Sequence, residues 1–107
     1  MASSEAKVKL DLNNPVFQDN LLTLQKPDER HAALDTLNEI RQLSWSQLYR
    51  DQGIRWEKIT SVRPPKGIDA IYSLRITQAC RATAYRDGDF IRLLTIAPDH
   101  DATYGRK

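Results

Sequence analysis

The chain has 107 residues, of which 28% are charged and 40% are hydrophobic. This length suits one domain, which we expect to span residues 1–107. One Cys excludes an internal disulfide, and one Cys with two distant His excludes a classical zinc cluster, so we expect no metal and no cofactor. Apolar runs are shorter than the roughly 18 residues that a membrane span needs. Since the start, MASSEAKVKL, lacks the apolar stretch of a signal peptide, we expect a cytoplasmic protein that does not enter a membrane.

The formal net charge of +2 is unevenly distributed along the chain. Residues 1–53 contain six Lys or Arg and eight Asp or Glu, a net of −2, whereas residues 54–107 contain ten and six, a net of +4. This asymmetry favours contact between the second half and an anion such as nucleic acid. A solvated basic surface would give the same composition.

The first elements predicted are a strand and a short helix. Polar and apolar residues alternate over residues 7–12, which is typical of a short strand. Asn13 or Asn14 can cap a helix that has Pro15 in its first turn and ends near Leu24.

A longer helix is predicted from about Pro27, because apolar residues recur at helical spacing. The stripe consists of Ala33, Leu34, Leu37, Ile40, Leu43 and Leu48. Ser44 and Gln47 have capping-box spacing, which predicts a kink or a restart of the helix, and Gly53 is a candidate C-terminal cap. The two helices form a hairpin whose apolar stripe must cover another element.

The second half predicts three strands, Ile71–Thr77, Cys80–Arg86 and Phe90–Ala97, which are rich in β-branched and aromatic residues. Asp87-Gly88 predicts a tight hairpin turn between the last two. The element order indicates an α+β fold with an N-terminal strand, a helical hairpin and a three-strand antiparallel meander. We expect the helices to pack on one face of the sheet.

The register of the first two meander strands has a consequence for charge. Pairing Leu74 with Ala82 keeps both on the apolar face and places Arg75 opposite Arg81 on the other face, whereas a slip of one residue would put Arg81 opposite Ile76. Like charges directly opposite cost on the order of 0.2–1 kcal/mol, and an anion bound between them would reverse the sign of that cost. The register therefore indicates either an anion site or a pair of ordinary surface arginines.

These strands resemble a known family. The segments Leu74–Thr77, Cys80–Tyr85 and Phe90–Ala97, with a polar tail that ends near Tyr104, resemble the RelE/ParE toxin superfamily. Its members typically show an R-I-x…x-R-x-x-Y pair of strands, a hydrophobic last strand and a C-terminal His, Arg or Tyr. The preceding strand and helical hairpin match the family's element order, so the resemblance covers nearly the whole chain and implies a RelE-like fold.

The RelE branch of the family implies a function. It consists of ribonucleases that cut mRNA, usually in the ribosomal A site, and each is held inactive by an antitoxin from the same operon. The resemblance thus implies a type II toxin, an mRNA interferase that acts with mRNA and the 70S ribosome and forms a hetero-oligomer with its antitoxin. Two alternatives stay open: a ParE-like toxin that inhibits DNA gyrase without cleaving anything, and an inactive domain of the same fold that only binds a partner.

The resemblance also implies site residues. Arg81 aligns with the arginine that holds the scissile phosphate, and Arg75 lies where the family often has another basic residue. Glu57 resembles the glutamate that acts as base in the YoeB-like members. His100 and Tyr104 fall where relatives place a catalytic His or Tyr.

These residue types suit metal-independent cleavage by the RNA 2′-OH, which needs a base, cations around the phosphorus and an acid. Arg75 and Arg81 suit the second role, since a guanidinium matches two phosphate oxygens and keeps its charge. Glu57 or His100 can be the base, and His100 or Tyr104 the acid. Each also has a structural interpretation: Glu57 as a surface acid, His100 as a cap of a turn, and Tyr104 as a side chain packed across the sheet end.

Arg92 is a further candidate for RNA contact on the last predicted strand. Strict alternation places it on the same face as Phe90, Leu94 and Ile96. The alternative is an edge position in which its apolar stem covers the sheet and its charge reaches water.

Overall fold

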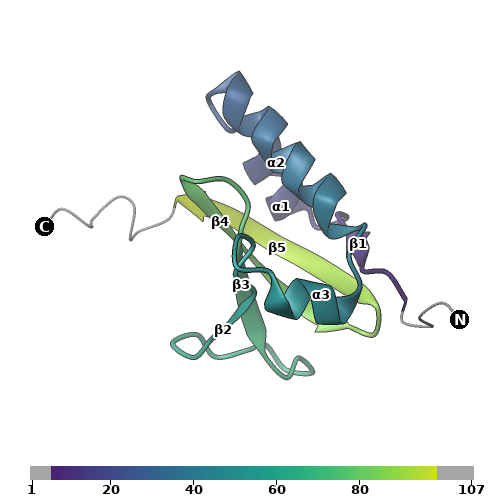
Figure 1. Cartoon of the computed structure of the whole chain (residues 1–107). Coiled ribbons are helices and arrows are strands. Elements are labelled where there is room, and N and C mark those ends of the chain that lie inside the picture. The colour runs from purple at the N-terminus through teal and green to yellow at the C-terminus, as the bar shows by residue number, and fades with distance from the viewer. Residues whose placement is uncertain (1–5, 99–107) are drawn as a thin grey trace, which may run out of the picture.

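The computed structural model describes residues 6–98, in which five strands form one mixed sheet (Figure 1). The strands are β1 (Lys9–Asp11), β2 (Glu57–Ile59), β3 (Ile71–Arg75), β4 (Cys80–Asp87) and β5 (Phe90–Pro98). Their order is β1-β5-β4-β3-β2, with β1 parallel to β5 and all other neighbours antiparallel. The expected α+β fold is confirmed, and the expected meander has β2 added at one edge and β1 at the other.

Three helices lie between β1 and β2 in the sequence: α1 (Pro15–Leu22), α2 (Pro27–Ile40) and α3 (Trp45–Arg50). The Asn14 side chain caps α1 by accepting a hydrogen bond from the Val16 N–H (2.8 Å). A capping box begins α3: Ser44 Oγ accepts from the Gln47 N–H, and Gln47 Oε1 accepts from the Ser44 N–H. The expected restart at Ser44 is therefore a separate helix.

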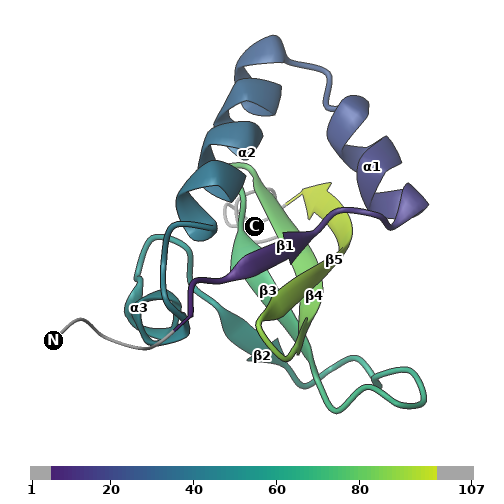
Figure 2. The ribbon, with the colours of Figure 1, turned by 90° about the vertical axis from the view of Figure 1, so that its right-hand side faces the viewer.

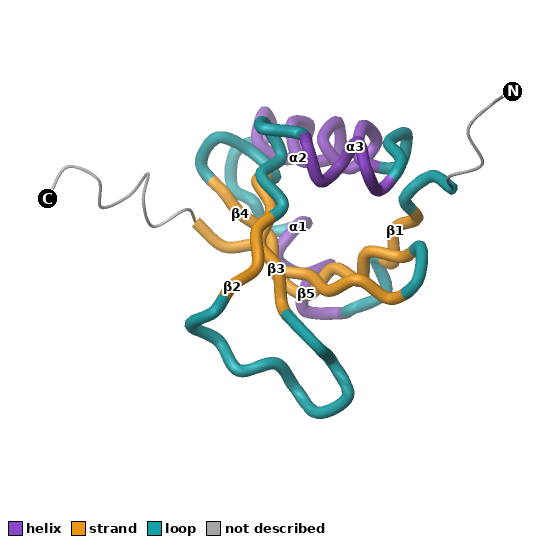
Figure 3. The backbone as a smooth tube through the Cα atoms, turned by 60° about the horizontal axis from the view of Figure 1, so that its bottom comes forward, coloured by secondary structure: helices purple, strands orange, loops and turns teal. Residues whose placement is uncertain are grey.

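The helices cover one face of the sheet, which we call the inner face. Figure 3 shows α2 and α3 on this side, and Figure 2 shows β1 beside β5 at the sheet edge. One hydrophobic core joins helices to strands, and its largest fully buried side chains are Trp45, Phe17, Ile40, Leu48, Leu74, Ile76, Ile91, Leu93 and Val8. Within residues 6–98, no helix has the length and apolar character that a membrane crossing requires. The opposite face, which we call the outer face, lies away from α2 and α3 (Figure 3).

A bulge interrupts the pairing of β4 with β5. Thr83 pairs with Thr95, whereas Ala84 pairs with Leu93, so Leu94 is an extra residue on β5. The extra residue reverses the alternation of side chains along β5, because each strand residue normally points to the face opposite its neighbour.

The bulge changes the face on which Arg92 lies. Ile91 is buried before the bulge and Ile96 after it, although strict alternation would place these two residues on opposite faces. Arg92 therefore lies on the outer face and Ile96 on the inner face. The expectation that Arg92 and Ile96 share a face is wrong, because it assumed uninterrupted alternation.

Other local expectations also need correction. Leu34 was expected in the buried stripe of the long helix but is 51% exposed, because α2 buries the narrower stripe that contains Ala33, Leu37 and Ile40. Gly53 does not adopt the left-handed conformation of a glycine cap; α3 ends at Arg50 with Asp51 as its C-cap. The first helix ends at Leu22, two residues before the expected end.

Candidate functional site

A row of polar side chains crosses the outer face from β2 to β5. Glu57 pairs with Ser73, Ser73 with Thr83, and Thr83 with Thr95, so the four residues lie on adjacent strands in one line. The Thr83 and Thr95 hydroxyls are 2.6 Å apart and hydrogen-bonded. The outer face thus offers hydroxyl and carboxylate groups where the inner face offers apolar side chains.

Arg81 on β4 leans across this row and is held there by two acceptors. Its Nη2 donates to Ser73 Oγ (2.8 Å) and to the Arg55 carbonyl oxygen (3.1 Å). The side chain is 19% exposed, and its Nε and Nη1 make no hydrogen bond within residues 6–98. Arg81 is therefore fixed in place while part of its guanidinium still has N–H groups to donate to a ligand.

The fold brings Glu57 next to Arg81. Glu57 Oε1 lies 3.8 Å from Arg81 Nη2, although the two residues are 24 positions apart in the sequence. The contact depends on β2, because the pairing of Glu57 with Ser73 puts the carboxylate beside the same serine that holds Arg81. The two residues that the family resemblance named for base and phosphate contact are thus neighbours on one surface.

Arg55 is a third member of the cluster that the sequence analysis did not identify. Its backbone is left-handed (φ +55°), the only non-glycine residue with positive φ in the described chain, and such conformations cluster at functional sites. This turn directs its carbonyl to Arg81 and its Nη2 to Glu57 Oε2 (3.4 Å). No sequence signal marks it, because arginine has no preference for this conformation.

Arg75 on β3 is the strand neighbour of Arg81. It pairs directly with Arg81, which confirms the predicted register, and its Nη1 donates to the Gln78 carbonyl (3.1 Å). Its own N–H donates to the Ile54 carbonyl (2.6 Å), which ties β3 to the segment that leads into Arg55. Arg55, Arg75 and Arg81 with Glu57 carry a formal charge of +2 (three minus one), which suits a phosphate group.

Arg92 lies apart from this cluster. It pairs with Tyr85, which lies four positions after Arg81 on β4, about 13 Å along the strand. Arg92 donates to Asp11 on β1 and to Asp87 on β4 (Nε to Oδ2, 2.9 Å), and these two carboxylates raise its pKa, Asp11 more than Asp87. The pKa of Asp11 is lowered, first by the Asn13 backbone N–H (2.9 Å) and then by Arg92. Arg92 thus joins three strands.

The remaining candidates, His100 and Tyr104, lie outside the described residues. Among residues 6–98, no group of three or more His, Cys, Asp or Glu side chains is arranged to hold a metal ion.

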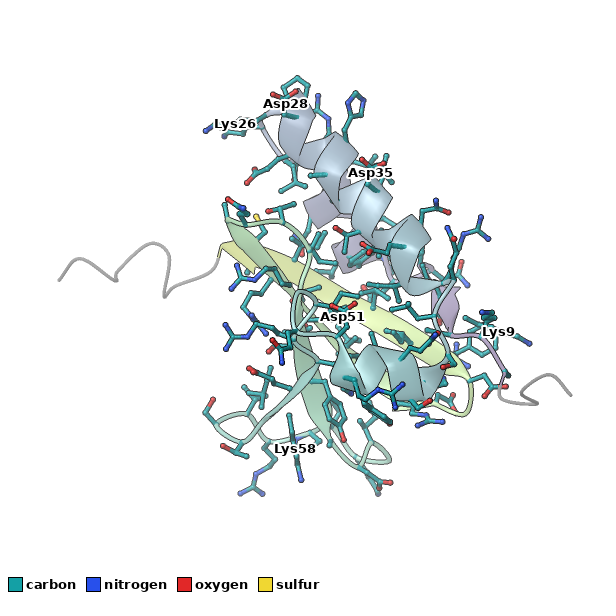
Figure 4. The ribbon with its side chains drawn as sticks, viewed as in Figure 1. Lys9, Lys26, Asp28, Asp35, Asp51 and Lys58 are labelled. Carbon is teal, nitrogen blue, oxygen red and sulfur yellow. The ribbon has the colours of Figure 1, made fainter. Side chains whose placement is uncertain are left out.

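The described cluster brings together the Glu57 carboxylate and the guanidinium groups of Arg55 and Arg81, with Arg75 on the neighbouring strand. Side-chain sticks in Figure 4 show Asp51 close to the end of α3, on the segment that leads to the cluster, and Lys58 on β2 just after Glu57. Asp51 Oδ1 accepts hydrogen bonds from the Gly53 and Ile54 N–H groups (both 2.9 Å), which shapes the turn before Arg55.

No protein-family model, no curated protein and no solved structure matches the chain.

Proposed function

We propose that the protein is a RelE-like toxin of a type II toxin–antitoxin pair, a metal-independent endonuclease that cuts ribosome-bound mRNA. The observation that carries the proposal is the contact between Arg81 and Glu57, 3.8 Å apart on the outer face. The family resemblance names these residues for phosphate binding and for proton abstraction, and cleavage requires the two groups to reach adjacent atoms of one substrate. The small α+β fold agrees with such a toxin.

The proposed reaction is a transfer of the phosphate ester within the RNA. Glu57 takes the proton of the 2′-OH, the O2′ forms a bond to the adjacent phosphorus, and the P–O5′ bond breaks. Arg81, with Arg75 opposite it, stabilises the charge that grows on the phosphate oxygens. The departing 5′-oxygen takes a proton from His100 or Tyr104, and the products are a 2′,3′-cyclic phosphate and a 5′-hydroxyl.

The ion pair between Glu57 and Arg81 is weak enough for a substrate to replace it. At 3.8 Å, with the Glu57 side chain 54% exposed, the pair is of the kind worth only about 0–1 kcal/mol. A phosphate accepts charge-assisted hydrogen bonds from the guanidinium at shorter range. Binding of RNA then frees the carboxylate to act as base.

The proposal includes a cognate antitoxin as partner. Within the described chain β2, which begins at Glu57, pairs with β3 alone and forms one edge of the sheet. A segment of another chain that adds to this edge would cover the Arg81 cluster. The antitoxin is thus expected to protect Glu57 and Arg81 from RNA.

The test is a translation reaction with purified ribosomes and one defined mRNA, in which new mRNA ends are mapped by primer extension. We expect the wild-type protein to cut inside codons and Arg81→Ala to leave the mRNA intact while keeping its fold by circular dichroism. Arg41→Ala, which removes an exposed arginine on the helical side, is the matched control and should cut normally. Intact mRNA with the wild-type protein would contradict the proposal and favour gyrase inhibition, to be measured by a supercoiling assay, or an inactive binding domain.

A further inference from the structure

A groove continues from the Arg81 cluster toward helix α3, and the reaction proposed above does not use it. Its volume is about 780 Å³, and it runs from Glu57 and Arg55 past Trp56 to Tyr49 and Arg50 at the end of α3. We call it the α3–β2 groove. Arg55 and Glu57 line this groove and also contact Arg81, so the groove adjoins the residues proposed to hold the scissile phosphate.

Tyr49 gives the groove an aromatic surface with a fixed orientation. Tyr49 is 52% exposed to solvent, which is high for a large aromatic residue. Its hydroxyl is bound by Arg86 Nη1 (2.6 Å), and its ring centroid lies 5.7 Å from that of buried Trp45. The polar end of the ring is therefore satisfied and the ring is held still, while much of its surface stays open to a planar group.

Trp56 forms the inner wall of the groove. Its ring stacks on Tyr72 (4.6 Å between centroids, 13° between planes) and meets the edge of Trp45 at 5.6 Å. Its Nε1 is buried without a hydrogen-bond partner in the described chain. These contacts make the wall rigid, so a ligand enters a groove that is already formed.

Cationic side chains complete the groove. Arg50 and Arg55 are both exposed. Asp51 and Glu57 also line the groove, and their carboxylates are engaged by partners within the described chain: Asp51 accepts hydrogen bonds from the Gly53 and Ile54 N–H groups, and Glu57 contacts Arg55 and Arg81. An exposed aromatic ring beside arginines is the combination that binds single-stranded nucleic acid, by stacking a base and contacting its phosphate.

We propose that the α3–β2 groove binds a nucleotide next to the scissile phosphate, with its base stacked on Tyr49 and its phosphate at Arg50. The proposal rests on the proposed function, since it takes the RNA path from Arg81. Only an unpaired base can stack in this way, so the groove selects a single strand over a duplex. Tyr49 and Arg50 would thus contribute to the choice of cleavage site.

The test measures binding without cleavage, using a 12-nucleotide single-stranded RNA of mixed sequence in which every 2′-OH is methylated. The methyl groups block attack on phosphorus, so the probe stays intact. The chain has two tryptophans, and their indole N–H signals in a ¹H–¹⁵N spectrum report on the groove and the core separately. We expect saturable shifts of the Trp56 indole and of the amides of residues 49–57, with a smaller shift of the Trp45 indole.

Variants then identify the contacts, with dissociation constants from fluorescence anisotropy of the labelled probe. Tyr49→Ala should weaken binding about tenfold and Tyr49→Phe very little, since the ring provides the stacking. Arg50→Ala should weaken binding and reduce the slope of log affinity against log salt by about one. Arg41→Ala is the control and should bind as the wild-type protein does.

The results separate this proposal from the proposed function. Shifts confined to the outer face around Ser73 and Arg81, equal affinities of Tyr49→Ala and wild type, or no saturable binding would each overturn the groove proposal. Whether the protein is an endonuclease is decided independently, by the mRNA ends that the wild-type protein and Arg81→Ala form in the translation reaction.

Discussion

Ser73 is the side chain on which the orientation of Arg81 depends most. The Ser73 hydroxyl accepts from Arg81 Nη2 at 2.8 Å, a shorter contact than those to the Arg55 carbonyl and to Glu57. A hydrogen bond to a charged group is worth about 1.5–3 kcal/mol, and 1.4 kcal/mol corresponds to about tenfold in rate. We therefore expect Ser73→Ala to slow mRNA cleavage at least about tenfold and Ser73→Thr, which keeps the hydroxyl, to restore most of the rate.

Single-turnover cleavage of ribosome-bound mRNA measures this effect, with the free energy of unfolding recorded for each variant. A wild-type rate in Ser73→Ala, or a Thr variant as slow as the Ala variant, would show that the hydroxyl does not position Arg81.

Arg55 combines a charge with an unfavourable backbone conformation. A non-glycine residue with left-handed φ costs roughly 1–2 kcal/mol, and glycine avoids most of that cost but gains entropy in the unfolded chain. We expect Arg55→Gly to be more stable than Arg55→Ala by up to about 1 kcal/mol in urea denaturation. Both variants should cleave mRNA more slowly, because both lose the guanidinium beside Glu57. Equal stabilities would show that the backbone at this position is unstrained.

Among the secondary-structure elements, α3 depends on its capping box. Its six residues include buried Trp45 and Leu48 and the groove residue Tyr49, and so short a helix has little stability of its own. Ser44→Ala removes the acceptor for the Gln47 N–H and should lower the free energy of unfolding by about 1 kcal/mol. Ser61→Ala, in the exposed loop after β2, should have no measurable effect in the same urea denaturation. A Ser44→Ala protein as stable as wild type would contradict the role of the cap.

The short parallel pair β1–β5 is stabilised by the ion pairs of Arg92. The pKa of Asp11 is lowered below its ordinary value of 3.8, so the folded chain binds a proton at Asp11 less readily than the unfolded chain does. Its contribution to stability is complete above pH 3.8 and is lost as the pH falls through the lowered folded pKa. Asp11→Asn should therefore be less stable than wild type at pH 7, and the difference should shrink toward pH 2.5.

Urea denaturation at several pH values between 7 and 2.5 measures this difference. A constant difference over that range would contradict the stabilising role of the ionised Asp11 carboxylate.

The element boundaries show which features a sequence can predict. The cap at Ser44 and the turn at Gly88 (φ +62°) were predicted correctly, and the cap of α1 was narrowed to Asn13 or Asn14, because each depends on a few adjacent residues. The bulge at Leu94 was not predicted, because the extra residue is fixed by the pairing with β4 and leaves no local signal. Because of that one extra residue, Arg92 and Ile96 lie on opposite faces of the sheet.

The complete fold is needed to assemble the site. The register of Arg75 with Arg81 could be predicted, since both lie on adjacent strands with clear alternation. The approach of Glu57 to Arg81 depends on the pairing of β2 with β3 across an eleven-residue connection (residues 60–70), and alternation alone does not specify that pairing. Arg55 enters the cluster through a backbone conformation that its residue type does not favour.

The central claim is that Arg81 and Glu57 act together in cutting mRNA. The most direct measurement is the single-turnover cleavage rate of one defined ribosome-bound mRNA with wild type, Arg81→Ala, Glu57→Gln and the double variant. When two groups act together in one step, removing the second after the first costs little further rate. We therefore expect each single variant to be slow and the double variant to be about as slow as the slower single variant. A folded Arg81→Ala protein that cleaves at the wild-type rate, or a wild-type protein that leaves the mRNA intact, would contradict the account.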